Sequence, residues 1–445
     1  MTAILRNASF SPTFIGNAKA QGKSKLSQFS YGDAMKALVL SAGPGEEMRP
    51  LTGTHQKTLL RLQGCKILEY VLEGLNSIGI DDFVVVTGYW AKEVSEFLSD
   101  WSERRAIPVE EVAQGNKIGV EGAILAGEDE FSSLDTPWLL AFGDIVAPNG
   151  FYHHILNTLV NTGTSGTLAV TLRGSVSDFG LVALDEKSRV VATIQRPPEE
   201  VTQSHGNYVM AGAAVLPPTF FEHMKNRDSI DGAIEELLNR NEQLSAAIWD
   251  HHWTDIGYPW DLLSANRLLF EETKYSTIHE SASISATAQI QGLVVIEEGV
   301  EIDHHAVIRG PVYIGKNAYI GTSALIRDHT AVEHDCMIGY ACEIKNSVIQ
   351  PHSTIGRLSF IGDSVVGEGA DIRSGVTTHN ELLGKRSIRK TAITIKGVTY
   401  DKLGAIVGRG ADVGPNTVVM PTGTIEPGEI VSPSSVVPPT AFKEQ

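Results

Sequence analysis

From Ile284 onward, an aliphatic residue recurs at every sixth position of the chain. Eleven consecutive positions of this frame hold only isoleucine or valine: Ile284, Ile290, Ile296, Ile302, Ile308, Ile314, Ile320, Ile326, Val332, Ile338 and Ile344. The frame slips by one residue before Ile349, is interrupted at 377–403, and returns at Val407. A six-residue period is typical of a parallel β-helix, whose aliphatic side chains stack inward from coil to coil. We therefore predict a β-helix over residues 284–440.

Residues 35–268 have a different pattern, in which short apolar runs alternate with helical periods. The clearest runs predict a helix at 66–78 and strands at 37–40, 83–87, 138–142 and 167–171. Alternating strands and helices indicate a mostly parallel sheet that is covered on both faces. Ligands of such sheets bind outside the carboxyl ends of the strands, so the loop after Leu40 is the first place to look for chemistry.

The ends of the chain and the join between the two regions are less regular. Residues 1–34 are rich in serine and asparagine and have no acidic residue before Asp33. Acid-poor, serine-rich N-termini are typical of organelle-targeting peptides. A single arginine and the lack of an amphipathic period instead favour a flexible tail, or a start codon assigned too early. We predict a linker at 269–283 and a short tail at 441–445.

The charge balance and the cysteines exclude several classes of protein. Asp and Glu number 53 against 36 Lys and Arg, which gives a formal net charge of −17. A protein that binds nucleic acid through its phosphates has the opposite balance, so we expect no nucleic-acid partner. No apolar run approaches the roughly 20 residues needed to cross a bilayer. Cys65, Cys336 and Cys342 are odd in number and lack metal-binding spacing, which favours a reducing cytoplasm.

The interruption at 377–403 is basic in an otherwise acidic chain. It carries Lys385, Arg386, Arg389, Lys390 and Lys396. One interpretation is a solvated loop that leaves the coil. The other is a binding segment for an anionic ligand, such as a phosphate or the pyrophosphate of coenzyme A, because excursions from a repeat scaffold often carry ligand contacts. The sequence leaves both open.

Three motifs in the first region resemble one family. The loop after Leu40 continues Ser-Ala-Gly-Pro-Gly-Glu-Glu-Met-Arg-Pro-Leu-Thr52, followed by Gln56-Lys57, and is similar to the signature loop G-x-G-T-R-x-x-P-L-T…P-K of the sugar-1-phosphate nucleotidyltransferases. Gly143-Asp144 and the segment Trp253-Thr-Asp-Ile-Gly-Tyr-Pro-Trp-Asp-Leu-Leu-Ser-Ala-Asn266 resemble two further elements of that family.

With the β-helix behind these motifs, residues 35–440 resemble the archaeal-type bifunctional N-acetylglucosamine-1-phosphate uridylyltransferases and glucosamine-1-phosphate acetyltransferases. The fold class this implies is α/β: a Rossmann-like nucleotidyltransferase domain followed by a left-handed parallel β-helix of hexapeptide repeats. The substrates it implies are a nucleoside triphosphate and a sugar-1-phosphate, in a pathway like that to UDP-N-acetylglucosamine.

The resemblance also implies the roles of individual residues. Mg²⁺ would be held by the carboxylates of Asp144 and Asp255, and Lys57 would offset negative charge on the phosphates; these three are the expected catalytic residues. The positions that match the family's nucleotide contacts are Ala42, Gly43, Gln114 and Gly119. Those that match its sugar-phosphate contacts are Gly180, Gln195, Arg196 and Gly212.

Several positions depart from the family pattern. The family's loop Thr-Arg pair is Glu46-Glu47 here, so a carboxylate stands where a cation usually faces the phosphates. Loss of one such preorganised group commonly lowers a rate by on the order of 10²–10³. Gln195 replaces the acid that usually holds the sugar, and Met210 replaces an asparagine that also contacts it.

The acetyltransferase motif His-Leu-x-Tyr-x-Gly-Asp is altered as well. Arg357 stands at the position of the histidine base, and an arginine stays protonated and cannot act as a base. Phe360 lacks the tyrosine hydroxyl, while Asn380 matches a substrate-contacting asparagine. Acetyl-CoA is the cofactor that the resemblance implies for this site, and these alterations argue against ordinary acetyl transfer.

Two principal hypotheses follow from the matches and the departures. The retained Lys57, Asp144 and Asp255 favour a sugar-1-phosphate nucleotidyltransferase. The altered positions favour a degenerate homologue that regulates or supports a partner subunit. An acyltransferase of altered specificity is a third option.

Related hexapeptide-repeat proteins pack around a threefold axis, so we expect a homotrimer. The apolar residues expected to supply its contacts are Leu293, Val294, Val295, Tyr313 and Tyr319.

Overall fold

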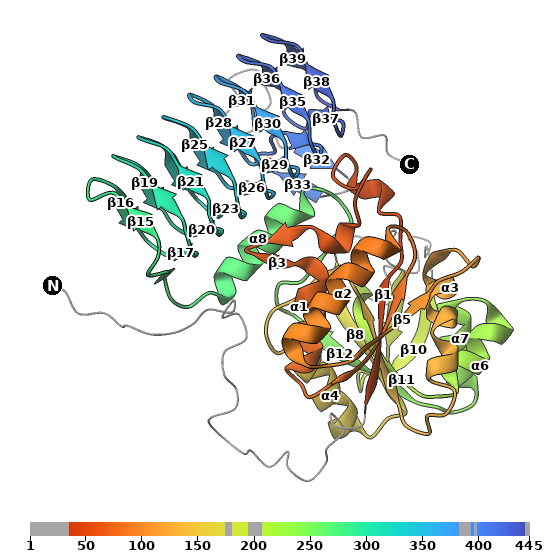
Figure 1. The fold of residues 1–445 in the computed structure, drawn as a ribbon. Helices are drawn as coiled ribbons and strands as arrows, with labels where there is room; N and C mark the ends of the chain where they lie inside the picture. The colour runs from red at the N-terminus through yellow and green to blue at the C-terminus, as the bar shows by residue number, and fades with distance from the viewer. Residues whose placement is uncertain (1–34, 174–179, 195–206, 382–392, 396–397, 441–445) are drawn as a thin grey trace.

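The computed structural model describes residues 35–173, 180–194, 207–381, 393–395 and 398–440. An α/β domain lies beside an elongated stack of coils, and helix α8 (Asp261–Glu272) runs between the two (Figure 1). In the described part of the chain, no helix is long and apolar enough to cross a membrane. The basic residues of the interruption, from Lys385 to Lys396, lie outside the described residues.

The α/β domain is built on a seven-stranded sheet. Its order is β12 (Leu244–Trp249), β8 (Gly166–Leu172), β11 (Tyr208–Leu216), β6 (Trp138–Phe142), β1 (Lys36–Ser41), β4 (Asp82–Thr87) and β5 (Val109–Ala113). Neighbouring strands are parallel except where β11 pairs with β6 and β8. The predicted, mostly parallel sheet and its four predicted strands are confirmed.

Helices cover both faces of this sheet, because each presents one apolar side to it. One core contains residues of α1 (Ile67–Asn76), α2 (Ala91–Arg105) and α4 (Phe151–Thr162). The opposite core contains residues of α3 (Gly119–Ala126), α6 (Phe220–Arg227) and α7 (Ile230–Asn239). The smaller pairs include β2 (Arg61–Leu62) with β3 (Cys65–Lys66), and β9 (Leu181–Leu184) with β10 (Val190–Ile194).

The coils form a left-handed parallel β-helix of three eight-stranded sheets. The first sheet contains β14 (Thr277–Ile278), β17 (Val294–Ile296), β20 (Val312–Ile314), β23 (Thr330–Val332), β26 (Val348–Ile349), β29 (Val365–Val366), β34 (Ile406–Val407) and β37 (Thr424–Ile425). The second contains β15 (Ser283–Ile284), β18 (Glu301–Ile302), β21 (Tyr319–Ile320), β24 (Met337–Ile338), β27 (Thr354–Ile355), β30 (Asp371–Ile372), β35 (Asp412–Val413) and β38 (Ile430–Val431). The third contains β16 (Gln289–Gln291), β19 (Val307–Arg309), β22 (Leu325–Arg327), β25 (Glu343–Lys345), β28 (Phe360–Gly362), β31 (Thr377–Thr378), β36 (Val418–Val419) and β39 (Val436–Val437).

The six-residue frame is the inner surface of these coils. In the second sheet Ile302 pairs with Ile320, and Ile320 pairs with Ile338, so identical aliphatic side chains stack along the axis and are almost fully buried. The slip in the frame is a shortened corner, since Val332 pairs with Ile349 and not with residue 350. Within the predicted linker 269–283, the structure has the end of α8 and the strands β14 and β15.

The α/β domain is docked on the first sheet of the β-helix. The backbone of Arg61 exchanges two hydrogen bonds with the side chain of Gln350, at 3.0 and 2.7 Å. The N–H of Gly64 donates to Oε2 of Glu333 at 2.9 Å. The apolar cluster at this junction includes Leu62 and Leu262 from the α/β domain together with Val348 and Val365 from the β-helix.

This docking corrects the expectation for the oligomer contacts. Val294 lies inside the coil, and Tyr313 is buried against Phe270 of α8, with Leu293 and Val295 packed beside it. These four residues therefore serve the coil interior and the junction within one chain. Among them and Tyr319, only Tyr319 lies on another sheet, where it is half-buried.

Candidate active site

The loop after β1 is held in place by Gln56, the residue before Lys57. The Gln56 side chain is fully buried, and its Nε2 lies 3.1 Å from the carbonyl oxygen of Ser41, 3.3 Å from that of Gly43 and 3.1 Å from that of Tyr89. Its Oε1 accepts the backbone N–H of Lys57 at 2.8 Å. The Gln56 side-chain amide thus joins the ends of β1 and β4 to Lys57, one of the expected catalytic residues.

Replacing Gln56 by leucine is expected to lower the free energy of unfolding by about 1–3 kcal/mol, because buried carbonyl groups lose their donor. Urea unfolding of the full chain measures this change. Gln114→Leu is the matched control, since the Gln114 amide bonds two carbonyls of its own exposed loop, and a change within about 0.5 kcal/mol is expected there. Equal losses in the two variants would contradict the role given to Gln56.

Asp144 and Asp255 come together although they are far apart in sequence. Asp144 lies between β6 and β7 (Ile145–Val146), and Asp255 ends β13 (Thr254–Asp255). The short strands pair antiparallel with Asp255 opposite Ile145, and the N–H of Ile256 donates to the carbonyl oxygen of Asp144 at 3.0 Å. The pairing places both carboxylates at the carboxyl edge of the large sheet.

Lys57 lies against this pair of carboxylates. Its Nζ is 2.5 Å from Oδ2 of Asp144 and 3.4 Å from the carbonyl oxygen of Ile256. Burial alone would lower the pKa of Lys57, but the charges of Asp144 and Asp255 outweigh burial and raise it. Burial, and then the charge of Asp144, raise the pKa of Asp255 to about 7. The cluster therefore has more negative charge than Lys57 offsets.

The residues present fit a hard divalent cation. Oδ1 of Asp144 is buried and has no hydrogen-bond partner among the described residues. Asp255 adds a second carboxylate whose ionised form is disfavoured by its surroundings. A cation between the two would remove both penalties, and Mg²⁺ prefers such oxygen ligands.

The four expected nucleotide-binding positions lie along the same edge of the sheet. Ala42 is buried and its carbonyl oxygen accepts the N–H of Tyr89 at 3.2 Å, whereas Gly43 is exposed. Gln114 follows β5, and its Nε2 donates to the carbonyl oxygens of Lys117 and Gly119, each at 2.8 Å. Ala42 and Gly43 thus follow β1, Gln114 follows β5 on the other side of β4, and Gly119 begins α3.

The expected sugar-phosphate positions are described only in part. Gln195 and Arg196 lie outside the described residues. Gly180 has φ of 76° directly before β9, beside another undescribed segment. Gly212 has φ of 75° in β11, and a Cβ there would lie 2.6 Å from Cγ1 of Ile145. Glycine at 212 thus leaves room for the residue that follows Asp144.

A profile of the Nucleotidyl transferase family matches residues 36–272, which contain all of these side chains. The chain belongs to this family. A second profile, described as the GMPPB C-terminal domain, matches residues 308–400 of the β-helix.

Curated relatives match both halves of the chain together. A protein of Methanococcus maripaludis named bifunctional protein GlmU is 33% identical over 384 residues, covering 84% of this chain and 87% of the relative. A bifunctional sugar-1-phosphate nucleotidylyltransferase/acetyltransferase of Sulfurisphaera tokodaii is 28% identical, covering 84% and 90%. The low-salt glycan biosynthesis nucleotidyltransferase Agl11 of Haloferax volcanii is 29% identical, covering 76% and 94%.

The altered loop of this nucleotidyltransferase faces Lys57. Gly45 packs on the Lys57 stem, since a Cβ at 45 would lie 3.3 Å from Cβ of Lys57. Glu46 and Glu47 begin the short helix η3 (Glu46–Met48) and are exposed, and the charge of Glu47 adds to the rise in the pKa of Lys57. Glu47 therefore extends the negative field of the two aspartates.

The nucleotidyltransferase site also contains a cation that the sequence did not indicate. Cζ of Arg173 lies 4.7 Å from the centre of the Trp253 ring, at the end of β8. Burial lowers the pKa of Arg173, and the charges of Asp255 and Asp261 oppose that decrease. No motif includes Arg173, so only the fold reveals that it lies near the carboxylates.

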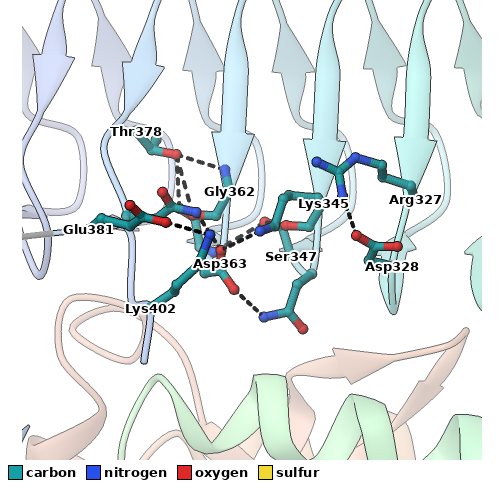
Figure 2. A network of polar contacts seen from close by, with 12 residues as sticks. Arg327, Asp328, Lys345, Ser347, Gly362, Asp363, Thr378, Glu381 and Lys402 are labelled. Carbon is teal, nitrogen blue, oxygen red and sulfur yellow. Dashed lines mark hydrogen bonds and ion pairs between the residues drawn. The ribbon is translucent and has the colours of Figure 1, made fainter. Parts of the chain in front are cut away.

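The altered acetyltransferase motif lies in the β-helix, around a buried carboxylate. Asp363 accepts hydrogen bonds from the amides of Asn346 and Asn380 at 2.6 and 2.5 Å, and Nζ of Lys345 is 3.4 Å away (Figure 2). A Cβ on Gly362 would lie 2.7 Å from Cζ of Phe360 and 2.9 Å from Nδ2 of Asn380, so these two side chains meet beside it.

Arg357 is not part of this cluster. Its side chain is exposed at a corner of the coil, whereas Asn380 is buried. His379, the residue before Asn380, follows Thr378 of β31, and its backbone N–H donates to the carbonyl oxygen of Val419 at 2.8 Å. The structure therefore brings Phe360 and Asn380 together and leaves Arg357 outside.

Proposed function

We propose that the protein is a sugar-1-phosphate nucleotidyltransferase that uses a nucleoside triphosphate and releases pyrophosphate. The observation that carries this proposal is the cluster of Lys57, Asp144 and Asp255 at the carboxyl edge of a parallel sheet. The names of the relatives support it, since two of those cited are nucleotidyltransferases by name.

In the proposed reaction, a phosphate oxygen of the sugar-1-phosphate attacks the α-phosphorus, and the bond from that phosphorus to the bridging oxygen breaks as pyrophosphate leaves. Mg²⁺, held by Asp144 and Asp255, would supply positive charge to the phosphate oxygens. Lys57 is positioned to add a further charge at this point. The exposed backbone of Gly43 leaves space for the nucleotide beside the end of β1.

A direct assay tests the proposal. The full chain is incubated with Mg²⁺, each of the common nucleoside triphosphates and a panel of sugar-1-phosphates, and pyrophosphate is measured. Release that requires both substrates is the expected result. No release with any pair would refute the proposal and support the degenerate homologue.

We do not extend the proposal to acetyl transfer. Arg357 offers no base, and it is exposed away from the buried Asp363 and Asn380. Incubation with acetyl-CoA and glucosamine-1-phosphate is therefore expected to release no free thiol above the rate without protein.

We also propose that the protein is a homotrimer, assembled through the β-helix away from the docked α/β domain. Three apolar side chains are exposed there: Met337 of β24 (54%), Tyr340 (53%) and Leu358 (62%). Tyr340 and Leu358 lie on adjacent coils, where the N–H of Leu358 donates to the carbonyl oxygen of Tyr340 at 2.9 Å. Exposed apolar side chains that adjoin one another in this way are typical of interaction surfaces.

Light scattering on the full chain is expected to give about three times the chain mass of 48.0 kDa. Leu358→Asp should reduce it to the mass of one chain, because a carboxylate would have to be buried in the interface. Leu172→Asp is the matched control, since Leu172 is similarly exposed, at 60%, on the α/β domain. A wild-type chain that is monomeric at micromolar concentration would contradict the proposal.

A further inference from the structure

Two histidines outside the catalytic cluster lie on adjacent coils of the β-helix. His334 follows β23 and His352 follows β26, at the corner between the first and second sheets. The N–H of His352 donates to the carbonyl oxygen of His334 at 3.1 Å, and the two rings are 5.0 Å apart at an angle of 86°. The parallel stacking of coils therefore holds the two imidazoles side by side.

A carboxylate lies between these imidazoles. Oδ2 of Asp335 is 2.8 Å from Nδ1 of His334 and 3.8 Å from Nδ1 of His352. One ligand atom from each of the three residues lies within 4.8 Å of the others. Oδ1 of Asp335 accepts a hydrogen bond from Nδ2 of Asn317 at 3.1 Å, which turns Oδ2 toward the histidines. Such outer contacts are how proteins orient metal ligands.

The cluster opens to a cavity of about 670 Å³ between the β-helix and the α/β domain, which both histidines line. The cavity gives an ion and its water a route to the ring nitrogens. Three arginines also line it, and each has another partner. Arg61 donates to the carbonyl oxygen of Gly64 at 2.6 Å, Arg104 to Oε1 of Glu69 at 3.1 Å, and Arg409 to Glu368 at 3.4 Å.

We propose that His334, Asp335 and His352 bind a divalent transition-metal ion of the Zn²⁺ class, with water from the cavity as a further ligand. Two imidazoles and one carboxylate are the donor set of Zn²⁺ or Co²⁺, whereas Mg²⁺ prefers oxygen ligands alone. The site is thus distinct in its chemistry from the Asp144–Asp255 pair. A bound ion links two successive coils at the edge of the junction between the domains.

The test is a titration of the full chain with Co²⁺ in excess Mg²⁺, followed by visible absorption and then by displacement with Zn²⁺. The expected result is one equivalent of Co²⁺ with the absorption of a nitrogen-ligated ion. His352→Ala should weaken binding by about a hundredfold or more, because loss of an outer contact alone commonly weakens it by about ten- to a hundredfold. Asn317→Ala should accordingly give a smaller loss, of about tenfold.

His304→Ala is the matched control and should bind Co²⁺ as the wild type does. His304 is an exposed histidine of the same β-helix, with Nε2 3.9 Å from its own neighbouring aspartate, Asp303. Absence of stoichiometric Co²⁺ binding by the wild type, or equal losses in His352→Ala and His304→Ala, overturns the proposal and leaves a hydrogen-bonded histidine–aspartate pair. His352→Ala should retain nucleotidyl transfer, so failure of this site is separable from failure of the proposed function.

Discussion

Asp255→Asn is expected to lower the rate of pyrophosphate release by about 10³ or more, since a neutral amide is a weaker ligand for a hard cation and the change removes one of the two carboxylates proposed to hold it. The same substitution should not destabilise the metal-free chain. Burial and the charge of Asp144 already disfavour the ionised form of Asp255, so replacing it with an uncharged group of the same shape relieves that penalty.

Measuring both quantities separates loss of the site from loss of the fold. The unfolding temperature of Asp255→Asn in the presence of a chelator should equal or exceed that of the wild type. Asp250→Asn provides the control, because Asp250 is 81% exposed a few residues earlier on the same segment. Unchanged activity in Asp255→Asn would remove the assignment of the metal ligands.

The β-helix could be predicted because its sequence repeats one local constraint. Each inward position must hold a side chain that fits against the same residue one coil away, as Ile302 does against Ile320, and so the frame is visible without any knowledge of tertiary contacts. The same argument explains the error at Tyr313. An apolar residue that points out of the coil can pack against a second chain or against another part of its own chain. Its position in the sequence does not show which, and Tyr313 packs against Phe270 of the docked domain.

The candidate site was predictable where residue type alone defines the chemistry. Asp144, Asp255 and Lys57 stand in motifs whose order matches the family, and the antiparallel pairing of β7 and β13 provides the contact that the motifs imply. Arg173 carries no such signal, because its proximity to the site depends on where β8 ends. His334 and His352 were also missed. These two residues are not neighbours in the sequence and lie side by side because they occupy the same place on successive coils.

Glu47→Arg is expected to raise the rate of nucleotidyl transfer by up to about 10²–10³, the amount that one preorganised charge-stabilising group commonly contributes. Glu47 is exposed in η3, and its charge acts on Lys57 in the same direction as the charges of Asp144 and Asp255. Glu47 therefore adds a third carboxylate to the two that the triphosphate would approach. Arginine at 47 would reverse one of these charges and offer the phosphates a planar donor.

Glu46→Arg distinguishes a specific contact from a change in net charge. Glu46 is exposed in the same short helix, and its substitution alters the net charge by the same amount. If the phosphates meet residue 47 in particular, Glu47→Arg raises kcat/KM and Glu46→Arg changes it much less. Equal gains would mean that only the field of the loop matters. A loss of activity in Glu47→Arg would show that Glu47 has a positive role, as a partner of Lys57 or of the substrate, and that the alignment of this loop with the family motif is wrong.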